Sequence, residues 1–154
     1  MHETADGHTK RLTVTLVNTT KTPQLPADLT PILERINAPW MPRIDCGEGW
    51  YALLLELDQA LSQVEPAYVI LQVKEKFGAL RFYFELPEPH LISESSDAQQ
   101  AEVERRAEQQ RVMTTLVIEA EERSMRTCER CGAPARTASR VEGWLKTSCR
   151  DCQA

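Results

Sequence analysis

Four of the five cysteines form two pairs with the same internal spacing, and this pattern is the clearest indication of chemistry in the sequence. Two residues separate Cys128 from Cys131, two separate Cys149 from Cys152, and 17 residues lie between the pairs. A CxxC turn brings two thiolates to one side of the backbone, and two such turns complete a tetrahedron around zinc. Gly132 directly follows the first pair and can adopt the positive φ with which the chain leaves the turn. The spacing therefore predicts a structural Zn²⁺ with four cysteine ligands and no coordination position open to substrate.

An iron–sulfur centre and a redox dithiol are the alternatives for these cysteines. The redox dithiol is the weaker one, because no βαβ pattern precedes either pair. The polar first 11 residues lack the hydrophobic stretch of a secretory signal. We therefore expect a reducing, cytoplasmic environment, in which paired cysteines bind metal rather than form disulfides.

The sequence offers no set of residues that is typical of a catalytic site. Cys46 is the fifth cysteine, and no histidine is linked to it by a motif, so we predict that it is a small buried residue without a catalytic role. Phosphate-binding, dinucleotide-binding and hydrolase motifs are absent. We predict that the protein is not an enzyme.

The elements that must position the cysteines follow from hydrophobic periodicity. Alternating residues predict a strand over 11–18, and a short helix is predicted over 27–36. The strongest helix is predicted over 48–64, where Trp50 begins an apolar stripe that continues to Val64. Residues 68–73 and 80–86 predict a β-hairpin, with Gly78 in its turn. A long helix should begin near Ser96 and run to Cys128, with its apolar stripe only from Met113 onward.

These elements predict an α+β fold, in which helices pack on a small antiparallel sheet and a C-terminal four-cysteine zinc ribbon follows. The predicted divisions are a flexible tail over 1–10, an α+β body over 11–126 that ends in the long helix, and the zinc-ribbon module over 127–154. The length of 154 residues suits one core with a small additional module. No apolar run approaches the roughly 20 residues that span a bilayer, so no membrane association is expected.

Charge is unevenly distributed along the chain. The net charge is −5, but residues 123–154 carry seven bases and three acids. A basic C-terminal module on an acidic body could contact nucleic acid, although solvated strand residues explain the same pattern. The candidate partner-binding residues are the basic and aromatic side chains of the predicted hairpin turn and ribbon: Lys74, Lys76, Phe77, Arg81, Arg136, Arg140, Trp144 and Lys146. The segment 98–111 has almost no apolar stripe, and it is a candidate surface for a partner or for homo-oligomer formation.

Three segments together resemble a family of small uncharacterised zinc-ribbon proteins from bacteriophages and prophages. They are the DCGEGWY sequence that starts at Asp45, the VKEKFGALRFY sequence that starts at Val73, and the C-terminal cysteine pairs with Gly143 and Trp144 between them. The resemblance implies a phage or prophage origin, the cytoplasm of a bacterial host as location, and a role in host takeover or counter-defence. It carries over no catalytic residue.

The function that we expect is therefore a non-enzymatic, zinc-stabilised binding protein that acts on a host or phage protein. The alternative is a nucleic-acid-binding accessory factor that uses the basic ribbon over 123–154. Binding to random DNA or RNA that weakens with salt would favour the alternative.

Overall fold

The computed structural model describes residues 27–37, 42–88, 95–135, 137–141 and 144–153. For residues 137–141 and 144 it describes the backbone but not the side chains. The predicted tail over 1–10, the predicted strand over 11–18 and Arg136 therefore lie outside the described residues, as do the side chains of Arg140 and Trp144.

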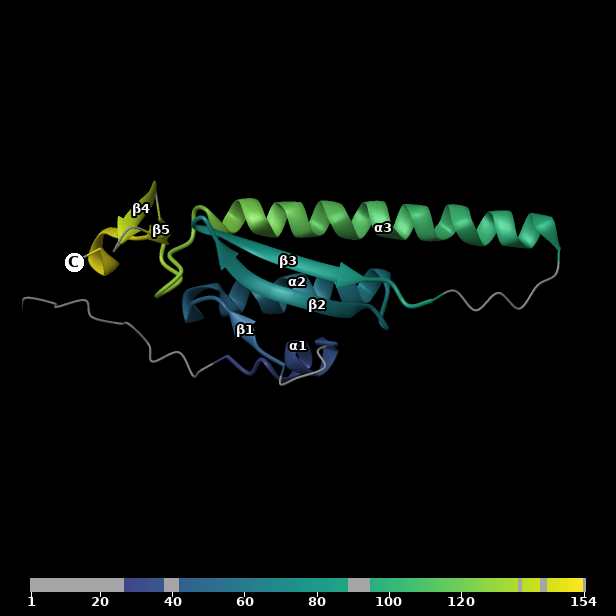
Figure 1. Cartoon of the computed structure of the whole chain (residues 1–154), viewed down its shortest axis with the longest axis horizontal. Helices are drawn as coiled ribbons and strands as arrows, with labels where there is room; N and C mark the ends of the chain where they lie inside the picture. Colours follow the sequence, from purple (N-terminus) through teal and green to yellow (C-terminus); the bar gives the residue numbers. More distant parts are fainter. Residues whose placement is uncertain (1–26, 38–41, 89–94, 136, 142–143, 154) are drawn as a thin grey trace, which may run out of the picture.

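A three-stranded sheet forms the centre of the body (Figure 1). Its strands are β1 (Ile44–Asp45), β2 (Val69–Lys76) and β3 (Ala79–Glu85), in the order β1-β2-β3. The strands β2 and β3 form the predicted antiparallel hairpin, with Lys76 opposite Ala79 at its end. The turn is therefore shorter than the predicted strand ends at residues 73 and 80 implied, with only Phe77 and Gly78 between the paired residues.

The sheet is mixed, and the prediction of an antiparallel sheet was wrong in this respect. The strand β1 runs parallel to β2, with Ile44 opposite Val73. A parallel pair requires a crossover connection, which the helix between the two strands provides. Because β1 has only two residues, it shows no alternation from which a strand could be predicted.

The helix α2 (Tyr51–Val64) covers one face of the sheet, and a short 3₁₀ turn, η1 (Glu48–Trp50), precedes it. The predicted stripe is confirmed, since its members are buried up to Leu61 and Val64 is partly buried. Helix α1 (Thr30–Arg35) is shorter than predicted and has Pro31 in its first turn. The most deeply buried core residues of these elements, all at most 1% exposed, are Ile32, Trp50, Leu54, Leu61, Tyr68, Ile70, Val73 and Leu80.

The long helix α3 (Ser96–Ser124) packs on the body only through its C-terminal half. Its buried residues are Met113, Val117, Ala120 and Ser124, as the returning stripe predicted. The Ser124 hydroxyl accepts a hydrogen bond from the Leu80 N–H at 2.9 Å. Such bonds satisfy the outer edge of β3, which would otherwise be open to another strand. The N-terminal half of α3 extends beyond the strands (Figure 1).

The chain after α3 forms a second, separate pair of strands. Strands β4 (Thr137–Val141) and β5 (Trp144–Ser148) are antiparallel, with Thr137 opposite Ser148, and a 3₁₀ turn, η2 (Arg150–Cys152), follows. Figure 1 shows this pair at the end of the molecule where α3 terminates. Among the described residues, no helix has an apolar stretch long enough to cross a bilayer.

Candidate metal centre and its docking on the body

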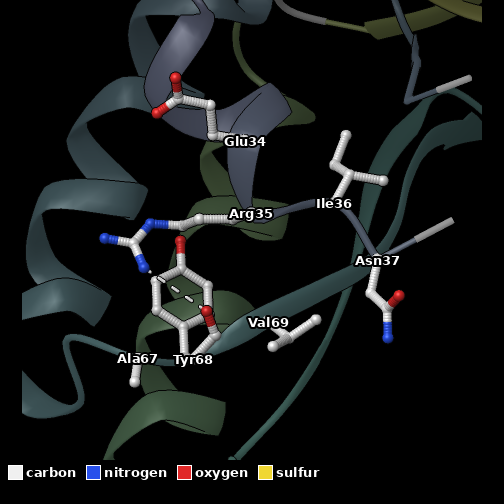
Figure 2. Close-up of a pocket in the computed structure, with 7 residues that line it drawn as sticks. All are labelled: Glu34, Arg35, Ile36, Asn37, Ala67, Tyr68 and Val69. Carbon is white, nitrogen blue, oxygen red and sulfur yellow. Dashed lines mark hydrogen bonds between the residues drawn. The ribbon is translucent and has the colours of Figure 1, made fainter.

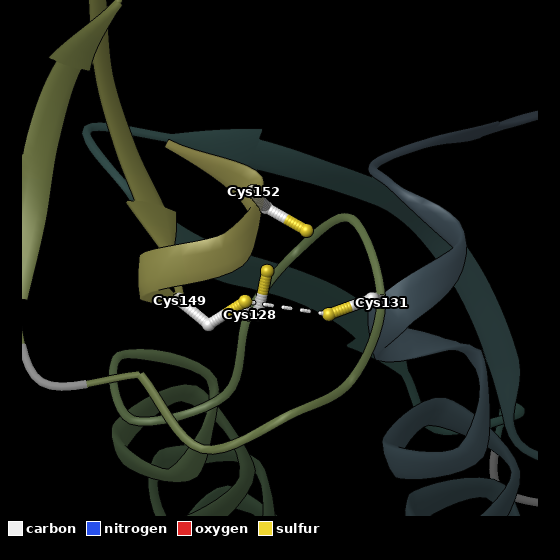
Figure 3. A group of neighbouring side chains, drawn as sticks. All are labelled: Cys128, Cys131, Cys149 and Cys152. Atoms are coloured by element: carbon white, nitrogen blue, oxygen red, sulfur yellow. Dashed lines mark hydrogen bonds between the residues drawn. The ribbon is translucent and has the colours of Figure 1, made fainter. Parts of the chain in front are cut away.

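The four paired cysteines meet in one cluster, where the turn after α3 faces the end of β5 (Figure 3). Their sulfur atoms all lie within 4.8 Å of one another, and Cys131 Sγ is 3.6 Å from Cys149 Sγ. A zinc–sulfur bond of about 2.3 Å places the ligands of a tetrahedral site about 3.8 Å apart. All five cysteines are free thiols. The cluster can therefore hold a metal ion, and the predicted ligand set is brought together in space.

The first CxxC turn is closed by its own backbone. The N–H of Gly132 donates to the carbonyl of Cys128 at 2.8 Å, and the N–H of Cys128 donates to the carbonyl of Ala133 at 2.7 Å. Gly132 has φ 75°, the left-handed conformation that the sequence predicted for this position. Both thiols of the pair are thereby directed to the same side.

The hydrogen bonds within the cluster stabilise one thiolate and keep other thiols protonated. Burial opposes ionisation of Cys128, but backbone N–H groups of Cys149, Cys131 and Arg130 point at its sulfur and lower its pKa to about 6. In contrast, hydrogen bonds with the sulfurs of Cys131 and Cys149 raise the pKa of Cys152 to about 12. One thiolate thus has preformed stabilisation, and a bound divalent cation would release the remaining protons. With four thiolates around it, such a cation has no open position for a substrate.

The turn that carries the first cysteine pair packs directly against the loop before α2. A Cβ atom added to Gly49 would lie 2.1 Å from the Cys128 carbonyl oxygen and 2.4 Å from the Gly132 nitrogen. A Cβ atom on Gly47 would lie 2.3 Å from the Glu129 carbonyl oxygen. Only glycine permits this approach of two backbones, so the loop is shaped to receive the cysteine turn.

Hydrogen bonds hold the two segments together. The Gly49 N–H donates to the Glu129 carbonyl at 2.8 Å, and the indole Nε1 of Trp50 donates to the Thr127 carbonyl at 2.8 Å. The Gly47 N–H donates to the Glu129 carboxylate at 3.0 Å. The Trp50 indole would lose this hydrogen-bond partner if the cysteine turn moved away. Because Trp50 is fully buried, the lost bond would leave a buried donor unsatisfied.

The side chain of Glu129 connects the cysteine turn to two further segments. This side chain is only 11% exposed, and its carboxylate forms an ion pair with Lys146 at 3.1 Å. Lys146 forms a second ion pair, with Glu75 of β2, at 3.0 Å. The Glu129 N–H also donates to the Thr147 carbonyl at 2.9 Å. Strand β5, the cysteine turn and the β2–β3 hairpin are thus joined by buried or half-buried polar contacts.

The same contacts fix the turn of the β2–β3 hairpin. The Thr147 hydroxyl donates to the Gly78 carbonyl, and the Gly78 N–H donates to the Glu75 carboxylate at 2.7 Å. Phe77 and Gly78 have φ of 56° and 77°, so both central residues of the turn are left-handed. Phe77 is 69% exposed at the tip.

The predicted partner-binding residues whose side chains are described fall into two groups, those at or near the hairpin tip and those paired with carboxylates of the protein itself. Lys74, Lys76 and Phe77 lie at or near the hairpin tip, where the lysine ammonium groups lie 5.4 and 5.2 Å from the ring centres of Tyr83 and Phe77. Arg81 lies on β3 and is ion-paired with Glu121 of α3 at 3.4 Å. Lys146 is placed between two carboxylates of the protein itself.

The basic character predicted for residues 123–154 is partly neutralised within the protein. Besides Lys146, Arg123 is ion-paired, with its guanidinium 2.6 Å from the Glu56 carboxylate. Sequence reasoning missed these pairs and also the roles of Gly47, Gly49 and Glu129. The two glycines around Glu48 were the available signal, because a glycine pair just before a helix is unusual unless another backbone approaches.

Cys46 lies next to this docking region and is partly buried. Burial raises the pKa of the Cys46 thiol to about 12, and the negative charges of Glu129 and Asp45 add to this effect. The thiol is therefore protonated near neutral pH, and a protonated thiol is a poor nucleophile.

A shallow hollow of about 400 Å³ lies elsewhere, between α1 and the start of β2 (Figure 2). Arg35 is its main charged residue, and its guanidinium bonds Asp58 at 2.8 Å, the Pro66 carbonyl at 2.7 Å and the Ser62 hydroxyl at 3.0 Å. It also lies 4.6 Å from the ring centre of Tyr68. These contacts join α1 to the end of α2, so Arg35 serves the fold rather than a ligand.

Comparisons with protein-family models, curated proteins and solved structures found no match to this chain. The resemblance to phage and prophage proteins therefore stays a prediction from the three sequence segments.

Proposed function

We propose that this chain is a non-enzymatic, zinc-stabilised binding protein of phage or prophage origin. It acts in the bacterial cytoplasm by binding a host or phage protein, in host takeover or counter-defence. The phage origin and its setting follow from the resemblance of the sequence segments, and the binding function follows from the contacts below.

The observation that carries this proposal is the direct packing of the cysteine turn on Gly47 and Gly49. A metal ion that holds this turn in shape also holds the C-terminal strands against the body, which is a structural task. Four cysteine thiols are the ligand set typical of a structural Zn²⁺, and the zinc ribbon is the corresponding fold of the C-terminal module.

The N-terminal half of α3 supports a binding role. The described contacts give it one hydrogen bond to the body outside the helix, from the Gln109 amide to the Val64 carbonyl at 3.1 Å. Ion pairs within the helix, such as Glu102 with Arg105 at 2.6 Å, stabilise the helix, but they do not attach this half of it to the core. Val103 is 60% exposed on this segment. A partner that covers this half-helix would account for its length.

A protein partner is favoured over nucleic acid because two bases of the segment 123–154 form ion pairs within the protein. Arg123 is bound to Glu56 of α2, and Lys146 is bound to Glu75 of β2 and to Glu129 of the cysteine turn. Phosphate contacts require cations that are free to replace counterions along the nucleic acid.

The test is capture of partners by the tagged, zinc-loaded full chain from a bacterial lysate, followed by mass spectrometry. We expect one protein in stoichiometric amount, and weaker capture by a variant that lacks residues 98–108 but keeps Gln109 and the stripe from Met113. A matched control replaces 98–108 with a helical sequence of the same length. Recovery of no stoichiometric protein, together with salt-sensitive binding to random DNA or RNA, would contradict the proposal and favour the nucleic-acid-binding alternative.

A further inference from the structure

The tip of the β2–β3 hairpin carries a residue that its own turn does not favour. Lys76 pairs with Ala79, so Phe77 and Gly78 are the two central residues, and both have positive φ. Turns of this type prefer Asn, Asp or Gly at both positions. A bulky aromatic side chain in the left-handed region is an outlier that costs stability. Phe77 nevertheless occupies this position.

Burial of the Phe77 ring does not offset the destabilisation caused by its left-handed backbone conformation. Phe77 is 69% exposed, the highest exposed fraction among the exposed large hydrophobic side chains of the described residues. Backbone strain that the fold does not repay is commonly found at functional positions.

The turn is held rigidly despite this strain. The Gly78 N–H is bound by Glu75 and the Gly78 carbonyl by Thr147, and Lys146 anchors Glu75 from the other strand pair. A side chain presented on such a support loses little conformational entropy when it binds, which favours affinity. The support depends on β5, and therefore on the cysteine cluster at the end of that strand.

Two lysines lie at or near the hairpin tip, and the ammonium group of Lys76 lies beside the exposed Phe77 ring. Among the described residues, Lys74 and Lys76 form no ion pair, although both lie near aromatic rings. The nearest acids in sequence and register are already bound: Glu75 holds Lys146 and the Gly78 N–H, and Asp45, opposite Lys74 on β1, bonds Arg43 at 2.8 Å. An uncompensated pair of lysines on a chain of net charge −5 marks a local surface that attracts carboxylates.

A second exposed apolar side chain lies on the face of β5 that contacts the hairpin turn. Leu145 is two residues from Thr147 on β5, and side chains two apart share one face of a strand. Thr147 contacts the hairpin turn, and Leu145 is 38% exposed. The tip thus offers an aromatic anchor and two cations.

We propose that Phe77 is the anchor of a docking surface for an acidic protein segment of a partner. In the complex, the Phe77 ring is inserted into an apolar recess of the partner. Carboxylates of the partner border this recess and pair with Lys74 and Lys76. This inference rests on the proposed function and specifies the chemistry of the partner. A nucleic acid is a poorer fit, because the lysine ammonium groups already lie near the rings on which bases would stack.

The test uses the zinc-loaded full chain to select binders from a displayed library of random linear peptides. We expect enrichment of peptides in which Asp or Glu flanks a large apolar residue. Fluorescence anisotropy should then show at least an about tenfold loss of affinity in Phe77→Asn, as for a central anchor residue. The double charge reversal Lys74→Glu/Lys76→Glu should weaken the same peptides. Ile118→Gln, a change of an exposed apolar residue on the C-terminal half of α3, is the matched control and should leave affinity unchanged.

The choice of Asn separates binding from folding. Asn tolerates the left-handed conformation, so Phe77→Asn should melt at the same temperature as the original chain or higher. A fall of several degrees would mean that Phe77 is needed for the fold, and would overturn the inference.

Four other results would overturn it. The first is that no peptide is recovered, and the second is that Phe77→Asn binds the peptides as tightly as the original chain. The third is that the original chain binds single-stranded oligothymidine and that, of the variants, only Phe77→Asn loses this binding. The fourth is that the original chain forms a dimer that Phe77→Asn dissociates. If the lysate experiment yields a stoichiometric partner that Phe77→Asn captures equally well, the proposed function stands and the anchor is wrong. If the lysate yields none and no peptide is selected, both are wrong.

Discussion

Replacement of Gly49 by alanine should separate the cysteine turn from the body. The new Cβ would lie 2.1 Å from the Cys128 carbonyl oxygen, 2.4 Å from the Gly132 nitrogen and 2.7 Å from the Cys131 nitrogen. All three are backbone atoms, so no side-chain rotation can relieve the overlap. The φ of Gly49 is not in the left-handed region, so alanine can adopt the backbone conformation and the whole effect comes from the contact.

The magnitude follows from the bonds that this displacement breaks. Ordinary contact of a Cβ atom begins near 3.4 Å, so the cysteine turn must retreat by more than an ångström. Such a shift breaks the hydrogen bonds from Gly49 N–H to Glu129 and from Trp50 Nε1 to Thr127, both 2.8 Å long. At about 1 kcal/mol for the bond from Gly49, and about 1 to 3 kcal/mol for the buried indole left without a partner, the loss is about 2 to 4 kcal/mol.

The assay is urea unfolding of the metal-loaded protein, combined with the rate at which a chelator removes the metal. Gly49→Ala should lower the free energy of unfolding by the stated amount and release metal faster, because the cysteine turn is no longer supported. Glu48→Ala changes the exposed residue beside it and is the matched control. If Gly49→Ala matched the original chain in both measurements, the docking contact would not contribute to stability or metal retention.

Three further predictions concern side chains that the structure places clearly. Purified protein should contain one zinc per chain, and Cys131→Ser should lose it and loosen the C-terminal strands; elemental analysis that finds metal-free but fully folded protein would contradict this. Cys46, whose pKa is raised to about 12 by burial, should remain unlabelled by iodoacetamide near neutral pH in the metal-loaded protein, whereas rapid labelling would revive a catalytic role. Burial and the hydrogen bond to Asp58 raise the pKa of Tyr68 above its ordinary value of 10.0, so its contribution to stability is complete below about pH 10 and is lost as the pH rises further. Urea unfolding at increasing pH should therefore show a shallower alkaline decline for Tyr68→Phe, and an identical decline would refute the assignment.

The sequence alone predicted the features that depend on local spacing. Two residues between paired cysteines determine that both thiols leave one tight turn, so the four members of the metal-binding set follow from the spacing itself. The apolar stripe of α2 and the limited stripe of α3 from Met113 follow from the 3.6-residue period of a helix. The β2–β3 hairpin followed from two apolar runs with Gly78 between them.

Only the tertiary structure decided how the cysteine turn meets the body. Gly47 and Glu129 are 82 residues apart, and no local pattern links a loop glycine to a distant carboxylate. The parallel strand β1 is two residues long, too short for any period to be visible, and it made the sheet mixed. Lys146 was predicted to be a solvated base or a partner contact. Its ion pairs could not be predicted, because the carboxylate partners come from the cysteine turn and from β2. Local periodicity and spacing are properties of one segment, whereas close backbone approach and ion pairing are properties of two segments, and these are set only when the chain folds.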